Sequence, residues 1–212
     1  GSGVNAYLST LQELRLVERR LPLTVRAGER GKSRSGRYHL GDAYFRFYFH
    51  FLAPFQDNPL LEAEQILERI QKDLRAFVGA TAFEELCRQW VIAQGRDGNL
   101  PFTPTAVGSH WSRRVQVDVA AVNWESKHLL LGECKWGADK IDRQVARDLI
   151  EEKTRKMMPD LPDMGEGWHI HYALFGRQGF TDSAKSEMRR VGGLCVDLKH
   201  IDAVLRKVES GG

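Results

Sequence analysis

Cysteine is scarce in this sequence, and long apolar runs are missing from it. The three cysteines, Cys87, Cys134 and Cys195, form no Cys-x-x-Cys pair and no Cys/His pattern with the spacing of a zinc site. An odd number of cysteines on apolar segments indicates buried free thiols in a reducing compartment. No apolar run approaches the roughly 18 residues that span a bilayer, and no signal peptide is recognisable. We therefore expect a soluble, cytoplasmic protein without a membrane partner.

The sequence also lacks internal repeats and low-complexity tracts, and its charge is nearly balanced. With 212 residues, of which 42% are hydrophobic, the chain can bury one substantial core and add a small accessory module. The formal net charge of +3 is unevenly spread, because residues 1–40 alone carry eight Arg or Lys against three Glu. A basic N-terminal module suits an anionic partner such as nucleic acid, and a solvated basic surface explains the same composition equally well.

Two groups of basic residues are candidates for contacts with nucleic acid. Lys32, Arg34 and Arg37 lie in a Gly/Ser-rich tract that should be an exposed loop, and Arg113 and Arg114 precede a predicted strand. Further basic residues on a predicted helix over residues 140–158 are alternatives, but ion pairs with the acids of that helix are the simpler explanation for them.

The N-terminal pattern predicts part of a winged helix. Apolar residues at helical spacing predict a helix over residues 4–15. A strand with a break at Pro22 is expected over residues 16–25, followed by the basic loop over 28–36 and a strand over 37–40. This order matches the second half of a winged helix, so we expect the chain to be a fragment of a longer protein.

Three domain segments follow from this interpretation: a partial winged-helix module over residues 1–56, a connecting helix over 57–75, and a larger α/β domain over 76–212. Asp42 should cap an aromatic helix over residues 43–52, whose rings we expect to be mostly buried. Helical sequence resumes at Leu60, with a predicted break near Gly79.

The most informative pattern lies in two predicted strands of the larger domain. Asp118 lies within an apolar strand over residues 115–122, and Glu133 and Lys135 end the next strand, over 128–135. Because side chains alternate along a strand, Glu133 and Lys135 share one face, and a hairpin would bring Asp118 beside them. Carboxylate oxygens suit Mg²⁺ or Mn²⁺, and a lysine beside them can hold a phosphate. The alternative is a pair of strand-end charges that reach solvent, with Lys135 as the partner of Glu133.

The order Asp…Glu-x-Lys, preceded by a helix with the pattern Gly79-x-x-x-Phe83-Glu84, resembles the PD-(D/E)XK nuclease superfamily. The sequence is most similar to the domain that archaeal-type (DEXX-box) P-loop ATPases carry at their C-terminus, behind a winged helix. That resemblance covers Phe83-Glu84, Val107-Gly108-Ser109-His110-Trp111, Val117-Asp118 and Gly132-Glu133-Cys134-Lys135-Trp136. It implies a restriction-endonuclease-like αβββαβ core, with a mixed sheet flanked by helices.

The resemblance also implies roles for individual residues. Asp118 and Glu133 would hold Mg²⁺ or Mn²⁺, and the Cys134 carbonyl would complete the metal shell. Lys135 would stabilise the phosphate or orient the attacking water. Glu84 would bind the metal through water or position the hydroxide, with Glu85 as its competitor.

Three functions are consistent with these residues. The leading hypothesis is a metal-dependent nuclease domain that acts on nucleic acid, with DNA as the expected substrate, together with a P-loop ATPase domain missing from this chain. The second is a nuclease-like DNA-binding or regulatory domain without catalysis. The third is a transcription-regulator-like module in which the winged helix is the active part. Gly31-Lys32-Ser33 mimics the end of a phosphate-binding loop, but Arg26 stands where that pattern needs glycine, so we expect no ATP binding by this chain.

Overall fold

The computed structural model describes residues 2–56, 58 and 62–210, and it divides into two compact units. Unit 1 comprises Gly1–Leu21 and Gly31–Thr81, and unit 2 comprises Pro22–Arg30 and Ala82–Gly212. Part of the predicted winged-helix segment, Pro22–Arg30, therefore belongs to unit 2. Of the predicted connecting helix, residues 57 and 59–61 lie outside the described residues.

Unit 1 begins with the helix, strand, loop and strand that the sequence predicts. Helix α1 (Ser2–Glu13) is followed by β1 (Val17–Arg20) and β2 (Arg37–Leu40), which pair antiparallel. The strand expected over residues 16–25 ends earlier, at Arg20. Beyond it the chain passes into unit 2, where the Leu23 N–H donates to the Ser109 carbonyl at 2.9 Å instead of continuing the ladder.

Two helices complete unit 1. Helix α2 (Ala43–Phe51) starts as predicted at Asp42, whose carboxylate accepts a hydrogen bond from the Phe45 N–H at 3.0 Å. A 3₁₀ turn, η2 (Ala53–Phe55), follows, and then the long helix α3 (Ala63–Thr81). The helix break predicted near Gly79 lies three residues later. Helix α3 continues to Thr81, and Ala82, with a φ of −120°, is no longer helical.

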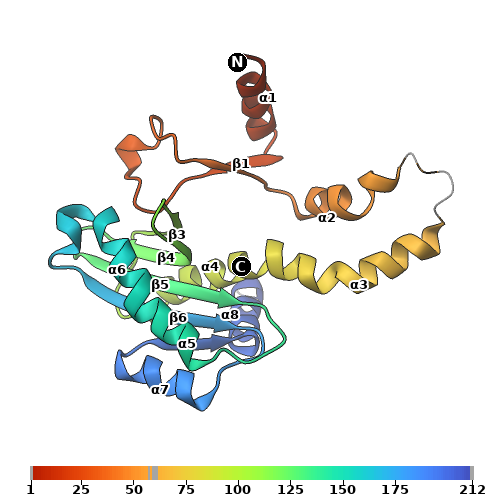
Figure 1. The fold of residues 1–212 in the computed structure, drawn as a ribbon. Helices are drawn as coiled ribbons and strands as arrows, with labels where there is room; N and C mark the ends of the chain where they lie inside the picture. Colours follow the sequence, from red (N-terminus) through yellow and green to blue (C-terminus); the bar gives the residue numbers. More distant parts are fainter. Residues whose placement is uncertain (1, 57, 59–61, 211–212) are drawn as a thin grey trace. The chain divides into compact units, whose positions relative to one another are not determined.

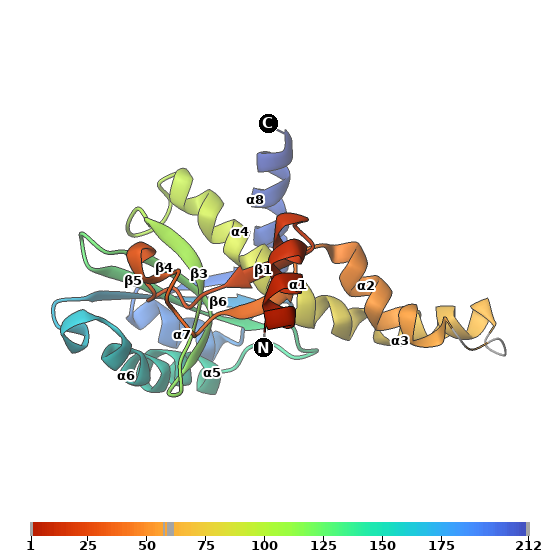
Figure 2. The same ribbon diagram turned by 90° about the horizontal axis from the view of Figure 1, so that it is seen from above.

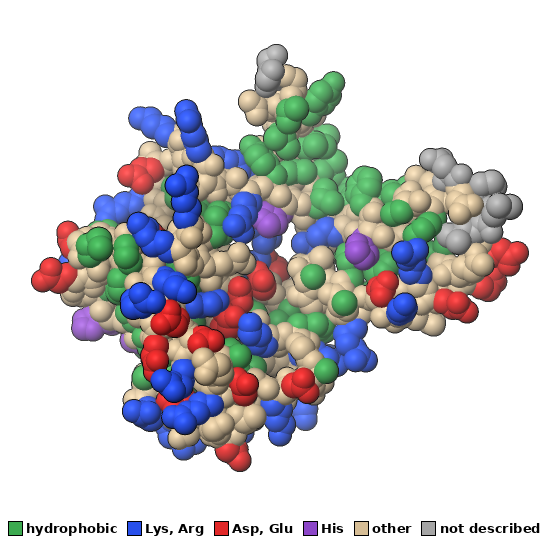
Figure 3. All heavy atoms as spheres, viewed as in Figure 1, with side chains coloured by type: hydrophobic (Ala, Val, Ile, Leu, Met, Phe, Trp, Pro, Cys, Tyr) green, Lys and Arg blue, Asp and Glu red, His purple; other side chains and the backbone are tan. Residues whose placement is uncertain are grey.

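The aromatic rings of α2 are less buried than the sequence analysis expected. Phe51 is buried against Phe47 and Phe77, with ring centroids 5.0 and 5.1 Å away, but Tyr44 is 62% exposed and Phe49 is 54% exposed. Among the described residues of unit 1, Phe51 is the one buried apolar side chain. The expectation was wrong because no second layer of described residues in this unit covers that face, and apolar side chains are visible over α1 and α2 in Figure 3.

Unit 2 is built on a five-stranded mixed sheet, as the sequence predicts. Its strands are β3 (Ala106–Trp111), β4 (Gln116–Asn123), β5 (His128–Lys135), β6 (His169–Gly176) and β7 (Leu194–Asp197). They lie side by side in chain order, with antiparallel pairing from β3 to β5 and parallel pairing from β5 to β7.

Helices cover both faces of this sheet (Figures 1 and 2). One face is covered by α4 (Phe83–Arg96) and α8 (Leu198–Ser210), and the other by α5 (Arg143–Arg147), a π-helical stretch η3 (Asp148–Lys153), α6 (Thr154–Met157) and α7 (Asp182–Arg190). Shorter 3₁₀ turns are η1 (Ala27–Glu29), η4 (Met158–Asp160) and η5 (Pro162–Gly165). This arrangement is a mixed α/β architecture with helices on both sides of one sheet.

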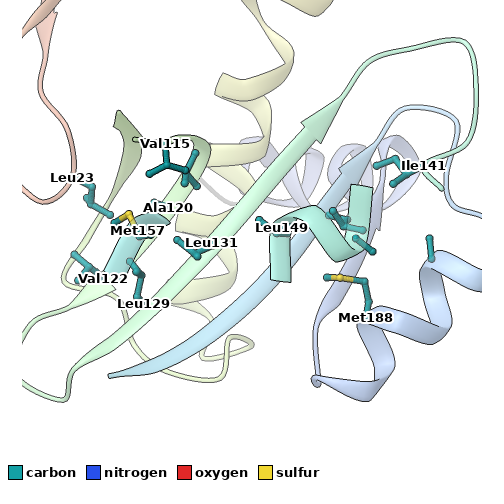
Figure 4. Close-up of a cluster of buried hydrophobic side chains, with 14 of the residues drawn as sticks. Leu23, Val115, Ala120, Val122, Leu129, Leu131, Ile141, Leu149, Met157 and Met188 are labelled. Atoms are coloured by element: carbon teal, nitrogen blue, oxygen red, sulfur yellow. The ribbon is translucent and has the colours of Figure 1, made fainter. Parts of the chain in front are cut away.

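The core of unit 2 follows from alternation along buried strands. Leu129 and Leu131 of β5 pack on the side of α5 to α7, together with Leu149 and Met157, whereas Leu130 packs on the side of α4 and α8 (Figure 4). All five side chains are at most 1% exposed, so β5 is a central strand buried on both faces. Within the described part of the chain, no helix has the length and apolarity needed to cross a membrane.

Candidate functional site

The site lies where β4 begins and β5 ends. The antiparallel ladder between these strands ends with the pair Val119 and Gly132, and Asp118 and Glu133 are the next residues along β4 and β5. Fifteen positions of sequence separate these two acids, and the hairpin brings them together.

Gly132 makes this close approach possible. A Cβ atom at this position would lie 3.0 Å from the Val119 carbonyl oxygen and 3.0 Å from the Phe175 ring. Such contacts are tighter than nearly all real Cβ contacts, so any larger residue would push β4 and β5 apart beside Glu133. A glycine directly before the second acid is therefore a geometric requirement of this strand pair.

A β-bulge in β4 sets the direction of the Asp118 side chain. The register between β3 and β4 shifts between Gly108 and His110, so that one β3 residue, Ser109, faces two β4 residues, of which Asp118 is one. Bulges bend a strand locally and re-aim its side chains. Here the Asp118 carboxylate accepts a hydrogen bond from the backbone N–H of Cys134 in β5 at 2.9 Å.

A chain of polar side chains supports the bulge from the α4 side. The buried Arg88 guanidinium donates to the Ser109 hydroxyl at 2.8 Å, and that hydroxyl donates to the Asp118 carbonyl at 2.7 Å. Arg88 also forms an ion pair with Glu85, one turn earlier in α4. The bulge would otherwise leave a buried carbonyl without a partner, so these contacts stabilise the strand at the point where the first acid lies.

Glu133 is held between two lysines. Its side chain is 8% exposed, and one carboxylate oxygen accepts from Lys135 Nζ at 2.8 Å. The other oxygen forms an ion pair with Lys153, which lies in the π-helical stretch η3. A buried carboxylate is costly without such partners, and each lysine supplies a charge-assisted hydrogen bond.

The electrostatics of the site show that its acids are close. Burial and the negative charge of Glu133 raise the pKa of Asp118 to about 6, against the hydrogen bond from Cys134, which lowers it. The charge of Glu84 adds a smaller upward contribution to the same pKa. Although partial burial favours the neutral amine, the hydrogen bond to Glu133 and its charge raise the pKa of Lys135. Lys135 is therefore a cation at neutral pH.

Glu84 and Glu85 have different surroundings. Glu84 lies 3.9 Å from Arg88 and its charge reaches both Asp118 and Cys134, where it raises each pKa. Glu85 instead binds the Arg88 guanidinium. The structure thus brings Glu84, Asp118, Glu133 and Lys135 together, with Glu84 rather than Glu85 as the helix acid that faces Asp118.

The Cys134 thiol is unsuited to metal binding. Burial, with a further contribution from the neighbouring Cys87, raises its pKa well above the usual value, so the sulfur stays protonated. Only the backbone carbonyl of Cys134 remains as a ligand, which is the atom that the sequence resemblance implies.

The oxygen donors fit a hydrated divalent ion and not a closed metal cage. Among residues 2–56, 58 and 62–210, no three His, Cys, Asp or Glu side chains are grouped to hold a metal ion. Mg²⁺ is often bound by only one or two carboxylates and keeps several waters. Asp118 and Glu133 provide two carboxylates, and the repulsion that raises the pKa of Asp118 would be relieved by a cation between them.

The remaining predicted residues lie elsewhere. Arg113 and Arg114 are exposed in the β3–β4 turn, and Arg114 binds Asp160 at 2.7 Å. The carboxylate of the same aspartate accepts a hydrogen bond from the buried His110 ring at 3.0 Å, an interaction that the sequence analysis did not foresee. Burial lowers the pKa of His110, although Asp160 opposes this.

Lys32, Arg34 and Arg37 are exposed in unit 1, as the loop composition predicts. The loop is joined to β1 by a hydrogen bond from the Arg19 guanidinium to the Ser33 carbonyl. These three basic residues belong to a different unit from Asp118 and Glu133.

Several basic residues on the helices of unit 2 form ion pairs. This favours surface ion pairs, rather than contacts with nucleic acid, as the explanation for the basic residues over 140–158. Arg147 pairs with Glu151 at 3.2 Å, as expected within one helix, whereas Arg143 pairs with Glu187 of α7 at 2.5 Å. Basic and acidic side chains are interspersed over this surface of unit 2 in Figure 3.

The sequence analysis missed two residues that contact the site, Lys153 and Arg88. Lys153 follows Ala146 and Leu149 and precedes Met157 on one stripe of the helix, and those three apolar residues are fully buried. A lysine on the buried stripe of a helix was the available signal. Arg88 offered a similar signal, since it precedes the fully buried Val91 by three positions on one stripe of α4.

The fold and site together define a mixed α/β protein with a cluster of acids and lysines at one end of its sheet. Residues 48–157 match DUF234, a family described as archaeal and bacterial proteins of unknown function, and the match contains Glu84, Asp118, Glu133 and Lys135. This chain belongs to that family.

One curated relative aligns with most of the chain. The sequence is 29% identical over 177 residues to an uncharacterized protein of Methanocaldococcus jannaschii, and the alignment covers 84% of this chain and 38% of that protein. The chain thus spans well under half the length of this curated relative. No solved structure matches the chain.

Proposed function

We propose that unit 2 is a metal-dependent nuclease domain of the PD-(D/E)XK type that hydrolyses phosphodiester bonds of DNA. The observation that carries this proposal is the placement of Asp118 beside Glu133, with Lys135 bound to Glu133 at 2.8 Å and with Glu133 and Glu84 both near enough to raise the pKa of Asp118. A mixed sheet that bears these groups at one end also supports the resemblance to that superfamily.

Asp118, Glu133 and the Cys134 carbonyl would hold Mg²⁺ or Mn²⁺. Such an ion, when bound, lowers the pKa of a bound water and offsets the charge that develops on a phosphate. Each Glu133 oxygen accepts from one lysine and keeps a second lone pair with which it would bind the ion.

The side chains of the site have distinct tasks in this proposal. Lys135, a cation at neutral pH and 46% exposed at its side chain, binds a phosphate oxygen or orients the attacking water. Glu84, also 46% exposed at its side chain, accepts a proton from that water or positions it. The Cys134 N–H and the Ser109 hydroxyl hold Asp118 in place by bonding its carboxylate and its carbonyl.

Unit 1 has features that fit a proposal about a longer protein. We propose that it is a partial winged helix that binds DNA through Lys32, Arg34 and Arg37, and that the chain is the C-terminal part of a P-loop ATPase. Val4, Tyr7 and Tyr44 are each more than 60% exposed, a pattern that suggests a surface covered by another part of the protein. The M. jannaschii relative has the additional length that such a domain needs.

A catalytically inactive DNA-binding or regulatory domain is the second candidate. The observation that favours it is the double lysine contact of Glu133, since two ammonium groups supply the positive charge that a metal ion would otherwise bring. A domain that kept this cluster for stability alone would retain the same ion pairs without turnover.

The test is a cleavage assay with supercoiled, linear and single-stranded DNA and with RNA, in Mg²⁺ or Mn²⁺, using both the 212-residue chain and its full-length parent. We expect Asp118→Asn, Glu133→Gln and Lys135→Ala each to abolish cutting, because one metal and one cation must act on the same phosphate. Glu84→Gln should be the mildest of the four, since its contact to the metal runs through water.

Matched controls are available in unit 2. Glu125→Gln alters an exposed acid in the β4–β5 turn, and Lys156→Ala removes a surface lysine; both changes should leave cutting within a few-fold of the original. Folded, metal-saturated protein that cuts none of these substrates, even in full-length form, would favour the inactive regulatory domain.

A further inference from the structure

A second cluster of metal-ligating side chains lies at the other end of the same sheet. His128 begins β5, His169 begins β6, and these two residues are paired across the parallel ladder. His171 is two positions further along β6, so it shares a face with His169. Glu133 is five residues along β5 from His128, or roughly 17 Å of strand, so the cluster is separate from the acidic site.

The His128 ring contacts both of the other imidazole rings. The ring of His128 lies 4.8 Å from that of His169 and 5.1 Å from that of His171, measured between centroids, and the second pair is nearly parallel, with 7° between the planes. His128 Nδ1 is 2.9 Å from His171 Nε2, so one ring donates a hydrogen bond to the other. The pair therefore contains at least one unprotonated nitrogen that faces its neighbour.

Phe102 limits the positions that two of these rings can take. Its ring stacks on His128 at 5.3 Å and on His171 at 5.2 Å, with interplanar angles of 29° and 28°. His169 is exposed, whereas His128 and His171 are half-buried. Because the His169 ring faces solvent, a small solute can reach the cluster.

The chemistry and placement of the three side chains suit a transition-metal ion. Neutral imidazole is the form that binds metals, and three histidines with one water are a known ligand set for Zn²⁺. A His-x-His pair on one strand and a histidine on the adjacent strand place three such rings next to one another on one face of the sheet.

We propose that His128, His169 and His171 form a binding site for a divalent transition-metal ion of the Zn²⁺ type. As the side chains stand, no three donors among the described residues converge on one point, because the rings are stacked and His128 bonds His171 directly. Binding requires two changes. The His128 and His171 nitrogens separate from 2.9 Å to about 3.3 Å, the spacing across a tetrahedral zinc ion, and His169 turns its exposed ring toward them.

Ligand chemistry distinguishes this site from the one at Asp118. Imidazole nitrogen prefers Zn²⁺, Ni²⁺ and Cu²⁺, whereas carboxylate and carbonyl oxygens prefer Mg²⁺ and Mn²⁺. Excess Mg²⁺ should therefore leave the histidine cluster free for Zn²⁺. The two sites can be measured separately, and this inference does not depend on nuclease activity.

The test titrates the EDTA-treated 212-residue chain with Zn²⁺ in millimolar Mg²⁺ at pH 7.5, by calorimetry, and with Co²⁺ by visible absorption. We expect one equivalent of Zn²⁺ and the intense absorption of four-coordinate Co²⁺. His128→Ala, His169→Ala and His171→Ala should each weaken Zn²⁺ binding by about tenfold or more, since even loss of an outer-shell partner costs that much. Asp118→Asn and Glu133→Gln should leave it unchanged.

His200→Ala is the matched control, because the His200 ring is exposed on α8 and bonds Asp197 at 2.7 Å, away from the other three histidines in sequence. His169→Ala is the decisive variant, since removal of an exposed ring should not disturb the fold, which circular dichroism checks. No stoichiometric binding, equal affinity in His169→Ala, or an equal loss in His200→Ala would each overturn the proposal and leave the cluster as packing at the sheet end.

Discussion

Lys153 forms an ion pair with Glu133, although the first lies in a helix and the second in the central strand that the helix covers. The contact is possible because Lys153 lies on the buried stripe of that helix, and its side chain is only 25% exposed. Together with Lys135 it leaves neither oxygen of the Glu133 carboxylate without a cation. The charge of the buried Glu133 carboxylate is therefore balanced by these two lysines.

Removal of Lys153 should destabilise the protein through Glu133. Lys153→Ala leaves the buried carboxylate with Lys135 alone, and we expect a loss of about 1–3 kcal/mol in the free energy of unfolding at pH 7.5. Urea denaturation measures it. In a Glu133→Gln background the same change should cost much less, because the charge that needs pairing is gone. Lys156→Ala, which removes only a surface pair with Glu152 at 3.6 Å, should stay within about 0.5 kcal/mol.

Asp118→Asn should stabilise the metal-free protein above pH 6. Burial and the charge of Glu133 raise the pKa of Asp118 from its ordinary value of 3.8 to about 6 in the folded state, so between these values the folded state binds the proton more strongly than the unfolded state. Stability from this group is therefore lost as pH rises from about 4 to 6. Relative to wild type, the variant should gain about 1–2 kcal/mol in the free energy of unfolding at pH 8 and nothing near pH 4. The reason is that asparagine, unlike Asp118, does not become charged as the pH rises.

The measurement for Asp118 is the difference in unfolding free energy between wild type and variant, in EDTA, across pH 4–8. Asp139→Asn, at an exposed loop position, is the control and should show no such pH-dependent difference. A variant that is equally or less stable at pH 8 would contradict the close placement of Asp118 and Glu133. Addition of Mg²⁺ should reverse the order, because wild type alone keeps both acidic ligands.

Ser109→Ala should disturb Asp118 without touching its carboxylate. The change removes the donor to the Asp118 carbonyl at 2.7 Å and the acceptor of the Arg88 hydrogen bond at 2.8 Å. We expect a loss of about 1–3 kcal/mol and a shifted Asp118 carboxyl titration by NMR, since the bulge is less well held. Ser126→Ala, at an exposed turn position, should change neither quantity.

The basic loop of unit 1 offers a test of nucleic-acid binding. Neutralising Lys32, Arg34 and Arg37 together should weaken DNA binding and reduce the salt slope by up to about three, because each phosphate contact contributes nearly one unit. Fluorescence anisotropy at several salt concentrations measures both. A control with Lys185, Arg189 and Lys199 neutralised keeps the same charge change on unit 2. Equal effects of both triple variants would show that only net charge matters.

The sequence predicted several features because local chemistry decides them. Asp42 begins helix α2 by accepting a hydrogen bond from the backbone N–H of Phe45, and a side chain makes such a bond with its own near neighbours. Alternation along β5 similarly places Glu133 and Lys135 on one face, and their contact at 2.8 Å follows from that spacing. Such features need no knowledge of distant segments.

Other features could not be predicted, since residues far apart in sequence decide them. The contact between Lys153 and Glu133, the bonds from Arg88 through Ser109 to the Asp118 carbonyl, and the choice of Glu84 over Glu85 all depend on how α4 and η3 pack on the sheet. The same holds for the three-histidine cluster, because His128 meets His169 and His171 only through the parallel pairing of β5 with β6.

The sequence by itself determined the strands, most helix starts and the candidate acids of this protein. Only the tertiary structure decided which cations neutralise those acids and which rings stack. The physical reason is that hydrogen-bond caps and strand alternation act over a few residues, whereas burial and charge pairing depend on the three-dimensional neighbours of each side chain.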